Sequence, residues 1–140
     1  MNCINLLFLS IRRVIECVSD MNANVLCMAC GSYRRGESTC GDVDILIGPP
    51  QGINFVGILP SLIKRLHDIG FLTADLAVPS TTETLCSSVV DKDARMSYMG
   101  VCKLFGSDAK FRRIDIKEYS KYQYPFALLY FTGSDIFNRY

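Results

Sequence analysis

The sequence predicts a single α+β (α/β) domain with a mixed β-sheet and helices packed on one face of that sheet. The chain has 140 residues, of which 49% are apolar and 21% charged, so it is long enough for one hydrophobic core and too apolar for a disordered segment. Patterns typical of helices and strands alternate along it in the order α-β-β-α-β-β-β-α. No internal repeat or low-complexity tract interrupts this order.

The first predicted element is a helix over residues 4–19, where apolar residues recur at helical spacing. Its apolar run, Ile4–Ile11, has eight residues and is too short to span a bilayer. Arg12 and Arg13 follow this run, whereas a signal peptide carries its positive charge before the apolar run. The segment is therefore interpreted as a core-packing helix, and both cytoplasm and nucleus stay open as locations.

Two strands then flank a polar loop over residues 31–41. Residues 25–30 form a short apolar run, which is typical of a buried strand. Residues 42–47 alternate acidic and apolar side chains, the period of a half-exposed strand, and Gly48-Pro49-Pro50 ends it. The later predicted elements are a helix over 58–69 capped by Gly70, strands over 72–78, 97–105 and 111–119, a loop over 79–92, a turn at 106–108, and helical segments over 126–131 and 135–139. The last pattern stops at Tyr140, so we expect a fragment of a longer protein.

Charge and cysteine content argue against a strongly basic surface and against a zinc or redox site at the cysteines. Fifteen Lys and Arg against 14 Asp and Glu leave a net charge of +1, so any phosphate binding must come from a local arrangement of residues. The seven cysteines are an odd number, which favours reduced thiols in an intracellular protein. Cys27 and Cys30 have CxxC spacing, but on a strand they point to opposite faces, and His67 is the one histidine. We therefore expect neither a zinc site nor redox chemistry there.

Asp42 and Asp44 are the first candidate catalytic residues. On a strand they share one face, while Val43 and Ile45 share the other. Adjacent carboxylates repel each other unless cations bridge them, and their hard oxygen atoms suit Mg²⁺. Two solvated aspartates on an outer face are the alternative.

A possible phosphate-binding turn precedes this pair. Gly31 follows a buried strand, and Ser32 can cap a helical turn whose backbone N–H groups would point toward an anion. The guanidinium of Arg35 can hold phosphate oxygens in bidentate fashion. A solvent-exposed loop with two arginines is the alternative.

Asp115 is a third candidate. On the predicted strand over residues 111–119, Ile114 faces inward, so Arg113, Asp115 and Lys117 face the other way. If this strand lies beside residues 42–47, Asp115 joins the carboxylate pair, and three acids can hold two metal ions. A salt bridge from Asp115 to a neighbouring arginine is the alternative.

Three stretches, GSYRRG…CGDVDILI, FRRIDIK and LLYFTGSDIFNR, together resemble the family X DNA polymerases of the lambda/beta branch. The resemblance runs from about residue 11 to Arg139. It implies a palm of nucleotidyltransferase type in a template-directed DNA polymerase, with gapped or primed DNA and a dNTP as substrates. It further implies gap filling in base excision repair or end joining, in the nucleus.

The resemblance also implies roles for single residues. Asp42, Asp44 and Asp115 would hold two Mg²⁺ ions, for which Mn²⁺ is a substitute, and Arg113 would support Asp115 and the primer end. Tyr130 and Phe131 would lie under the sugar and exclude a ribose 2′-hydroxyl, with core packing as their alternative role. Contacts to the incoming nucleotide are implied for Gly31, Ser32, Arg35, Cys40, Gly41, Tyr130, Phe131, Gly133, Asp135 and Asn138.

Residues 1–140 resemble the palm alone. We expect them to lack the lyase domain, the helix-hairpin-helix DNA grips and the C-terminal subdomain of the family, and therefore to have weak or no activity by themselves. Two other hypotheses stay open: a fragment that folds but binds DNA too weakly to act, and a nucleotidyltransferase that acts on RNA or a small molecule. Phe131 stands where terminal transferases have tryptophan, which favours template-directed synthesis.

Overall fold

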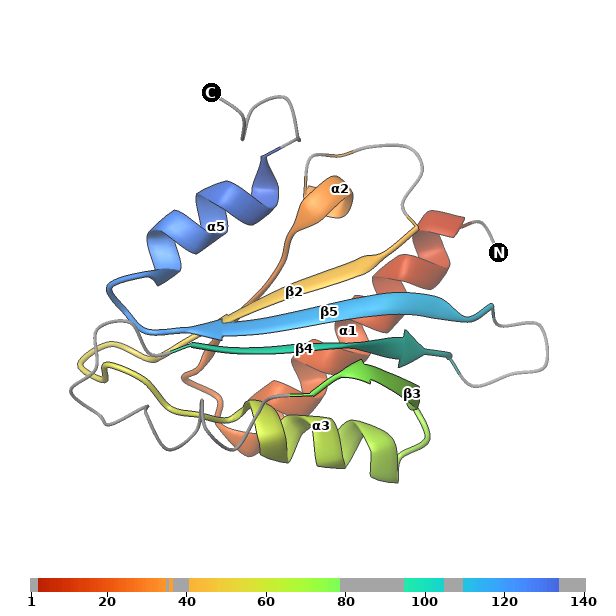
Figure 1. The fold of residues 1–140 in the computed structure, drawn as a ribbon, viewed down its shortest axis with the longest axis horizontal. Coiled ribbons are helices and arrows are strands. Elements are labelled where there is room, and N and C mark those ends of the chain that lie inside the picture. Colours follow the sequence, from red (N-terminus) through yellow and green to blue (C-terminus); the bar gives the residue numbers. More distant parts are fainter. Residues whose placement is uncertain (1–2, 35, 37–40, 79–94, 105–109, 134–140) are drawn as a thin grey trace.

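The computed structural model describes residues 3–34, 36, 41–78, 95–104 and 110–133. In these ranges a five-stranded sheet carries helices on both of its faces (Figure 1). The elements are α1 (Cys3–Met21), β1 (Leu26–Ala29), α2 (Gly31–Arg34), β2 (Val43–Gly48), α3 (Leu59–Asp68), β3 (Leu72–Ala77), β4 (Arg95–Cys102), β5 (Arg112–Tyr119) and α5 (Tyr124–Thr132).

The strand order in the sheet is β1-β2-β5-β4-β3. β2 and β5 are parallel, whereas β1 with β2, β4 with β5 and β3 with β4 are antiparallel. The chain leaves β2, forms α3, β3 and β4, and returns to place β5 beside β2. A parallel pair requires such a crossover, because a short hairpin joins only antiparallel strands.

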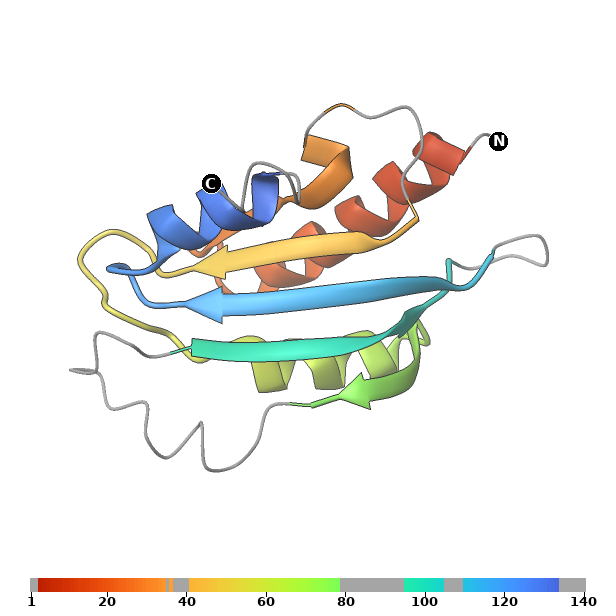
Figure 2. The same cartoon turned by 45° about the horizontal axis from the view of Figure 1, so that its top comes forward.

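The main hydrophobic core lies between the sheet and the helices α1 and α3; Figure 1 shows α1 behind the strands, and Figure 2 shows α3 behind β4. Each helix presents one apolar stripe, and every second residue of β2 and β5 meets it. Full burial of one such side chain stabilises the fold by about 1.5–3 kcal/mol. The central residues of the main core include Leu7, Val14, Ile45, Ile47, Leu62, Leu66, Ile114 and Ile116.

Helix α5 packs on the opposite face of the sheet, where Tyr124 and Ala127 contact Leu46 and Cys30 in a smaller cluster. Gly48 allows this close approach, since a Cβ atom there would lie 2.7 Å from Cε2 of Tyr124. The predicted α+β class with a mixed sheet is confirmed, with α1 and α3 together on one face. The part of the prediction that placed the helices on one face is wrong for α5, whose apolar residues surround the whole helix axis and so gave no indication of the face it covers.

The predicted elements agree with the structure to within three residues at their ends. β4 begins two residues and ends three residues before the predicted strand over 97–105, and just past its end the N–H of Lys103 donates to the carbonyl of Phe71 at 2.9 Å, next to the first residue of β3. A short helix, α2, lies within the predicted loop over 31–41. The predicted loop over 79–92, the turn at 106–108 and the helix over 135–139 lie outside the described residues.

The cysteine side chains that the structure describes lie in or beside the core. Cys17, Cys27, Cys30 and Cys102 are free thiols. Cys27 packs against the main core and Cys30 belongs to the smaller cluster, so the two point to different faces of the sheet. Burial raises the pKa of Cys27 to about 12, which keeps its thiol protonated. In the described part of the chain, no helix combines the length and apolar character needed to cross a membrane.

Candidate functional site

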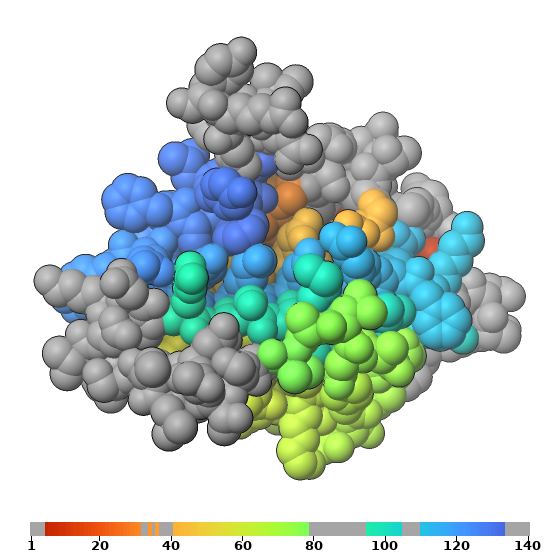
Figure 3. Space-filling model, viewed as in Figure 1, coloured from red at the N-terminus to blue at the C-terminus, as the bar shows by residue number. Residues whose placement is uncertain are grey.

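Asp44 and Asp115 face each other across the parallel pair of strands. Their Cα atoms are register partners between β2 and β5. Ile45 and Ile116 turn into the main core, so alternation directs both aspartates to the other face. The condition on which Asp115 joins the carboxylate pair, that residues 111–119 lie beside residues 42–47, is therefore met. In the space-filling view of this face, β4 and β5 reach the surface beside α5 (Figure 3).

Arg113 links the third carboxylate to this pair. Its Nη2 atom lies 3.5 Å from Oδ2 of Asp42 and 3.7 Å from Oδ2 of Asp115. Asp42 is exposed, whereas the Asp115 side chain is only 16% exposed. One guanidinium thus lies within ion-pair distance of two of the three carboxylates, and the salt bridge weighed as an alternative role for Asp115 is present.

Burial raises the pKa of Asp44 to about 6. The negative charges of Asp115 and Asp42 and a hydrogen bond between the Asp44 and Asp115 carboxyl groups act in the same direction, while Arg113 opposes them. Burial also raises the pKa of Asp115, against the positive charges of Arg113 and Lys117. Near neutral pH the pair therefore holds more negative charge than the protein alone stabilises, which favours a bound cation.

Asp115 also has an unsatisfied acceptor. Its Oδ1 atom is buried and has no hydrogen-bond partner. It lies beside a cavity of about 10 Å³, on the scale of one water molecule. The lining residues are Cys30, Asp44, Ile45, Leu46, Asp115, Lys117 and Phe131. A buried acceptor without a donor is a group that a cation or a water molecule can satisfy.

The donor chemistry at this site fits a hard divalent cation. Asp42, Asp44 and Asp115 offer carboxylate oxygens, which Mg²⁺ prefers. Across the described ranges, however, no three His, Cys, Asp or Glu side chains are already arranged as a metal-binding group. Arg113 supplies the positive charge between Asp42 and Asp115 instead. Both Arg113 contacts are to Oδ2 atoms, so Oδ1 of Asp115 is left without a partner.

The turn that starts at Gly31 lies against Asp44. Gly31 has a φ of 67°, and a Cβ atom there would overlap Oδ2 of Asp44. The N–H of Cys30 donates to the backbone carbonyl of Asp44 at 2.8 Å, which fixes the turn to β2. Ser32 lies in α2, and exposed Gly41 directly precedes Asp42. The side chain of Ser32, and Arg35 and Cys40 as whole residues, lie outside the described part.

The aromatic pair of α5 lies at the edge of the site. Phe131 is partly buried, with Lys117 Nζ 4.8 Å from its ring centroid and the Tyr119 centroid at 6.2 Å. Tyr130 is exposed and meets Phe131 edge-on at 5.1 Å. The two rings line an apolar groove of about 400 Å³ together with Tyr119, Gln123, Phe126 and Ala127. Tyr130 is therefore not a core residue, and Gly133 ends the helix; Asp135 and Asn138 lie outside the described residues.

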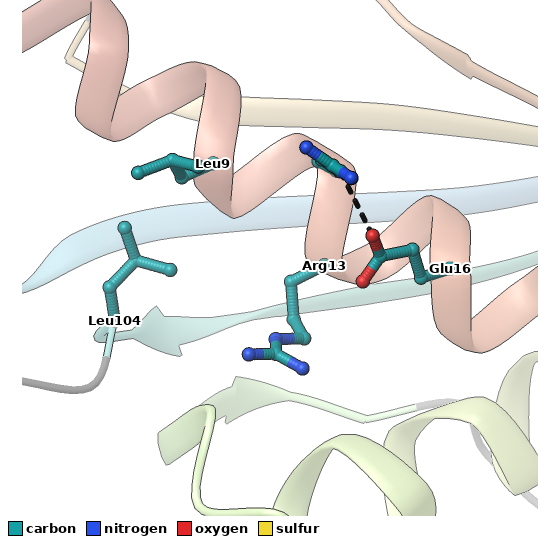
Figure 4. Close-up of a pocket in the computed structure, with 5 residues that line it drawn as sticks. Leu9, Arg13, Glu16 and Leu104 are labelled. Atoms are coloured by element: carbon teal, nitrogen blue, oxygen red, sulfur yellow. Dashed lines mark hydrogen bonds and ion pairs between the residues drawn. The ribbon is translucent and has the colours of Figure 1, made fainter.

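A second hollow, of about 290 Å³, lies along α1 on the other side of the sheet (Figure 4). Leu9, Arg13, Glu16 and Leu104 line it, and an ion pair of 2.9 Å between Arg12 and Glu16 crosses its wall. Because α1 packs on the face opposite to Asp44 and Asp115, this hollow takes no part in the carboxylate site.

Glu118 is a buried charged residue near the site that sequence reasoning missed. It lies three residues after Asp115 on β5, with 1% of its surface exposed. Its carboxylate accepts hydrogen bonds from the backbone N–H groups of Gly57, Ile58 and Leu59. The available signal was its position: in a strand it shares the inward face with Ile114 and Ile116, where a charged side chain is unexpected.

Asp44→Asn is expected to stabilise the metal-free protein at pH 8 by about 1–3 kcal/mol. The folded-state pKa of about 6 lies above the ordinary value of 3.8, so the folded state binds more protons and stability falls as pH rises through this window. Asparagine removes this penalty, and the benefit should disappear near pH 4. Urea unfolding in EDTA at both pH values measures it, with the exposed Asp68→Asn as control. Equal benefits at both pH values would contradict the assignment.

Comparison with known proteins agrees with this geometry. Residues 9–121 match the family model of the DNA polymerase beta palm. The chain is 44% identical over 118 residues to DNA polymerase lambda of Rattus norvegicus, an alignment that covers 84% of this chain and 19% of the relative. It is 40% identical over 116 residues to DNA polymerase lambda of Arabidopsis thaliana, covering 83% of this chain and 20% of the relative.

A third relative is the human DNA-directed DNA/RNA polymerase mu, 32% identical over 124 residues, with 78% of this chain and 25% of the relative covered. The chain thus spans about a fifth to a quarter of the length of these relatives.

Proposed function

The chain belongs to the DNA polymerase beta palm family, and from this premise we propose that it is the palm of a template-directed DNA polymerase of DNA repair. The reaction is attack of a primer 3′-hydroxyl oxygen on the α-phosphorus of a dNTP; the bond to the β-phosphate breaks and pyrophosphate leaves. The observation that carries the proposal is the pairing of Asp44 with Asp115 across parallel strands, with Asp42 joined to them through Arg113.

Asp42, Asp44 and Asp115 would hold Mg²⁺, or Mn²⁺ in its place, as two ions. When bound, the ions supply positive charge to the triphosphate and make the primer hydroxyl more acidic. Asp115 presents its unsatisfied Oδ1 atom toward this task, and its partial burial strengthens any interaction with a cation. Arg113, whose Nη2 atom lies 3.7 Å from Oδ2 of Asp115, would support Asp115 and the primer end.

The remaining contacts would orient the nucleotide. The turn at Gly31 and Ser32, with Arg35, Cys40 and Gly41, would hold the triphosphate through backbone N–H groups and a guanidinium. Tyr130, Phe131 and Gly133 would lie under the sugar, and Phe131 is suited to this because Lys117 and Tyr119 support its ring. Asp135 would lie against the incoming base and Asn138 would bind its minor-groove edge. We further propose gap filling in base excision repair or end joining, in the nucleus.

A palm exchange tests this function. The chain replaces the matching segment of the rat lambda relative, which supplies the rest of a polymerase, and extension of a primer across a one-nucleotide gap is measured. We expect Mg²⁺-dependent addition of the templated dNTP, abolished by EDTA, and little or no extension by the 140-residue chain alone. A chimera that folds and binds the gapped DNA without extending it would contradict the proposal. A strong preference for ribonucleotides would point to a different nucleotidyltransferase.

A further inference from the structure

Glu118 binds the start of α3 from the neighbouring strand β5. Its Oε2 atom accepts the N–H of Gly57 at 2.8 Å and of Ile58 at 3.3 Å, and its Oε1 atom accepts the N–H of Leu59 at 3.0 Å. Gly57 has a φ of 74°, which lets three successive N–H groups converge on one anion. The carboxylate thus serves groups at the first turn of a helix that has no side-chain cap of its own.

Besides their direct pairing, β2 and β5 are connected by these hydrogen bonds, which join Glu118 of β5 to the segment that follows β2. The segment that carries Gly57 begins where β2 ends, at Gly48, and leads into α3. Besides Glu118, the N–H of Lys121 donates to the carbonyl of Asn54 in the same segment at 2.8 Å. Figure 2 shows this connection running past the ends of β2 and β5. The C-terminal end of β5 is therefore tied to the chain that continues from β2.

The position of β5 along β2 decides where Asp115 points. Asp44 pairs with Asp115, and three residues later Ile47 pairs with Glu118. A slip by one residue would turn Asp115 into the core and remove it from Asp44, because side chains alternate between faces. Apolar residues such as Ile116 tolerate more than one packing arrangement, whereas a buried carboxylate is satisfied only where its three donors are.

The energetics also point to a role in specificity. Burial raises the pKa of Glu118 although three backbone hydrogen bonds oppose this rise, so the charge is costly where it lies. A leucine of similar size would avoid that cost, and such replacements of buried charges are often neutral or stabilising. What the carboxylate adds is that only one register of β5 against β2 satisfies its hydrogen bonds.

We propose that Glu118 is a positioning residue for the carboxylate site: by fixing β5 lengthwise against the segment that follows β2, it holds Asp115 opposite Asp44. The part of this inference that concerns cation binding rests on the proposed function, whereas the part that concerns strand register stands without it.

The test compares Glu118→Leu and Glu118→Gln with the parent 140-residue chain by two measurements. Cross-strand nuclear Overhauser effects between β2 and β5 report the register, and Mn²⁺ titration followed by paramagnetic broadening of the Asp44 and Asp115 amides reports cation binding. For leucine we expect weakened or doubled cross-strand signals and a fall in Mn²⁺ affinity of about 10- to 100-fold. Glutamine keeps one acceptor oxygen but places an NH2 donor where the second oxygen accepts a backbone N–H, so its register signals and Mn²⁺ affinity should lie between those of the parent and of the leucine variant.

Ile116→Val is the matched control, because Ile116 is buried on the same face of β5 and shortening it leaves the backbone hydrogen bonds of Glu118 in place. It should lower stability while leaving Mn²⁺ affinity and register unchanged. If Glu118 contributed to stability alone, Glu118→Leu would likewise leave Mn²⁺ affinity and register unchanged. Parental register and affinity in Glu118→Leu would overturn the inference. If that variant does not fold, parental values in Glu118→Gln overturn it. A parent without Mn²⁺ binding counts against the proposed function, and the register signals still decide the role of Glu118.

Discussion

Asp115→Asn is expected to lower the rate of nucleotide incorporation by the palm chimera by about a thousandfold or more, while the protein stays folded. Asp115 lies opposite Asp44, within reach of Arg113, and carries the buried acceptor that has no donor. Asparagine has the same shape but lacks the charge that binds and orients a cation. Because the substitution also removes one of two repelling charges, stability should not fall.

Single-turnover incorporation into a gapped primer measures this effect, and urea unfolding checks the fold. Asp68→Asn is the control, since Asp68 is an exposed residue of α3 that pairs with Lys64 and lies on the other side of the sheet. An Asp115→Asn chimera that retains activity within tenfold of the parent would remove this residue from the proposed mechanism.

The second large effect is expected for Gly31→Ala. Alanine in the left-handed conformation costs about 1–2 kcal/mol. In addition, its Cβ atom would overlap Oδ2 of Asp44 and lie 3.1 Å from Cγ of the same residue. The carboxylate can rotate away more easily than the backbone of β2 can move, so the clash is relieved by displacing Asp44. We therefore expect activity to fall by at least about a hundredfold, far more than the loss of stability alone explains.

Gly36→Ala is a closely matched control for this substitution. Gly36 has a φ of 74°, similar to the 67° of Gly31, but no atom lies within 4 Å of the Cβ position. It therefore carries the backbone cost without the clash. Equal activity of the two variants in the chimera would show that the contact with Asp44 does not matter.

The sequence predicted those features that depend on local periodicity. The alternation over residues 42–47 placed Asp42 and Asp44 away from the core, and the same argument placed Arg113, Asp115 and Lys117 on one face of β5. The structure confirms the strands and the pairing of Asp44 with Asp115. The roles of these residues in metal and nucleotide binding stay predictions.

Features that depend on long-range packing could not be predicted from local sequence patterns. Nothing local to α5 says which face of the sheet it covers, since its apolar residues surround the axis. Arg113 was expected near Asp115, but its contact with Asp42 required the strand positions in space. Glu118 has partners about 60 residues away, and no pattern over a short window contains them.

The parallel pairing of β2 with β5 has a consequence for how the site comes into being. Asp44 and Asp115 are 71 positions apart in the chain, and the crossover through α3, β3 and β4 separates them. Pairings between such distant segments form slowly, because the entropy of loop closure is lost before the new contacts stabilise the chain. We therefore expect the two carboxylates to approach and repel each other only when the other strands are already paired. Ligands of this cluster would then prolong the lifetime of the native state without hastening its formation.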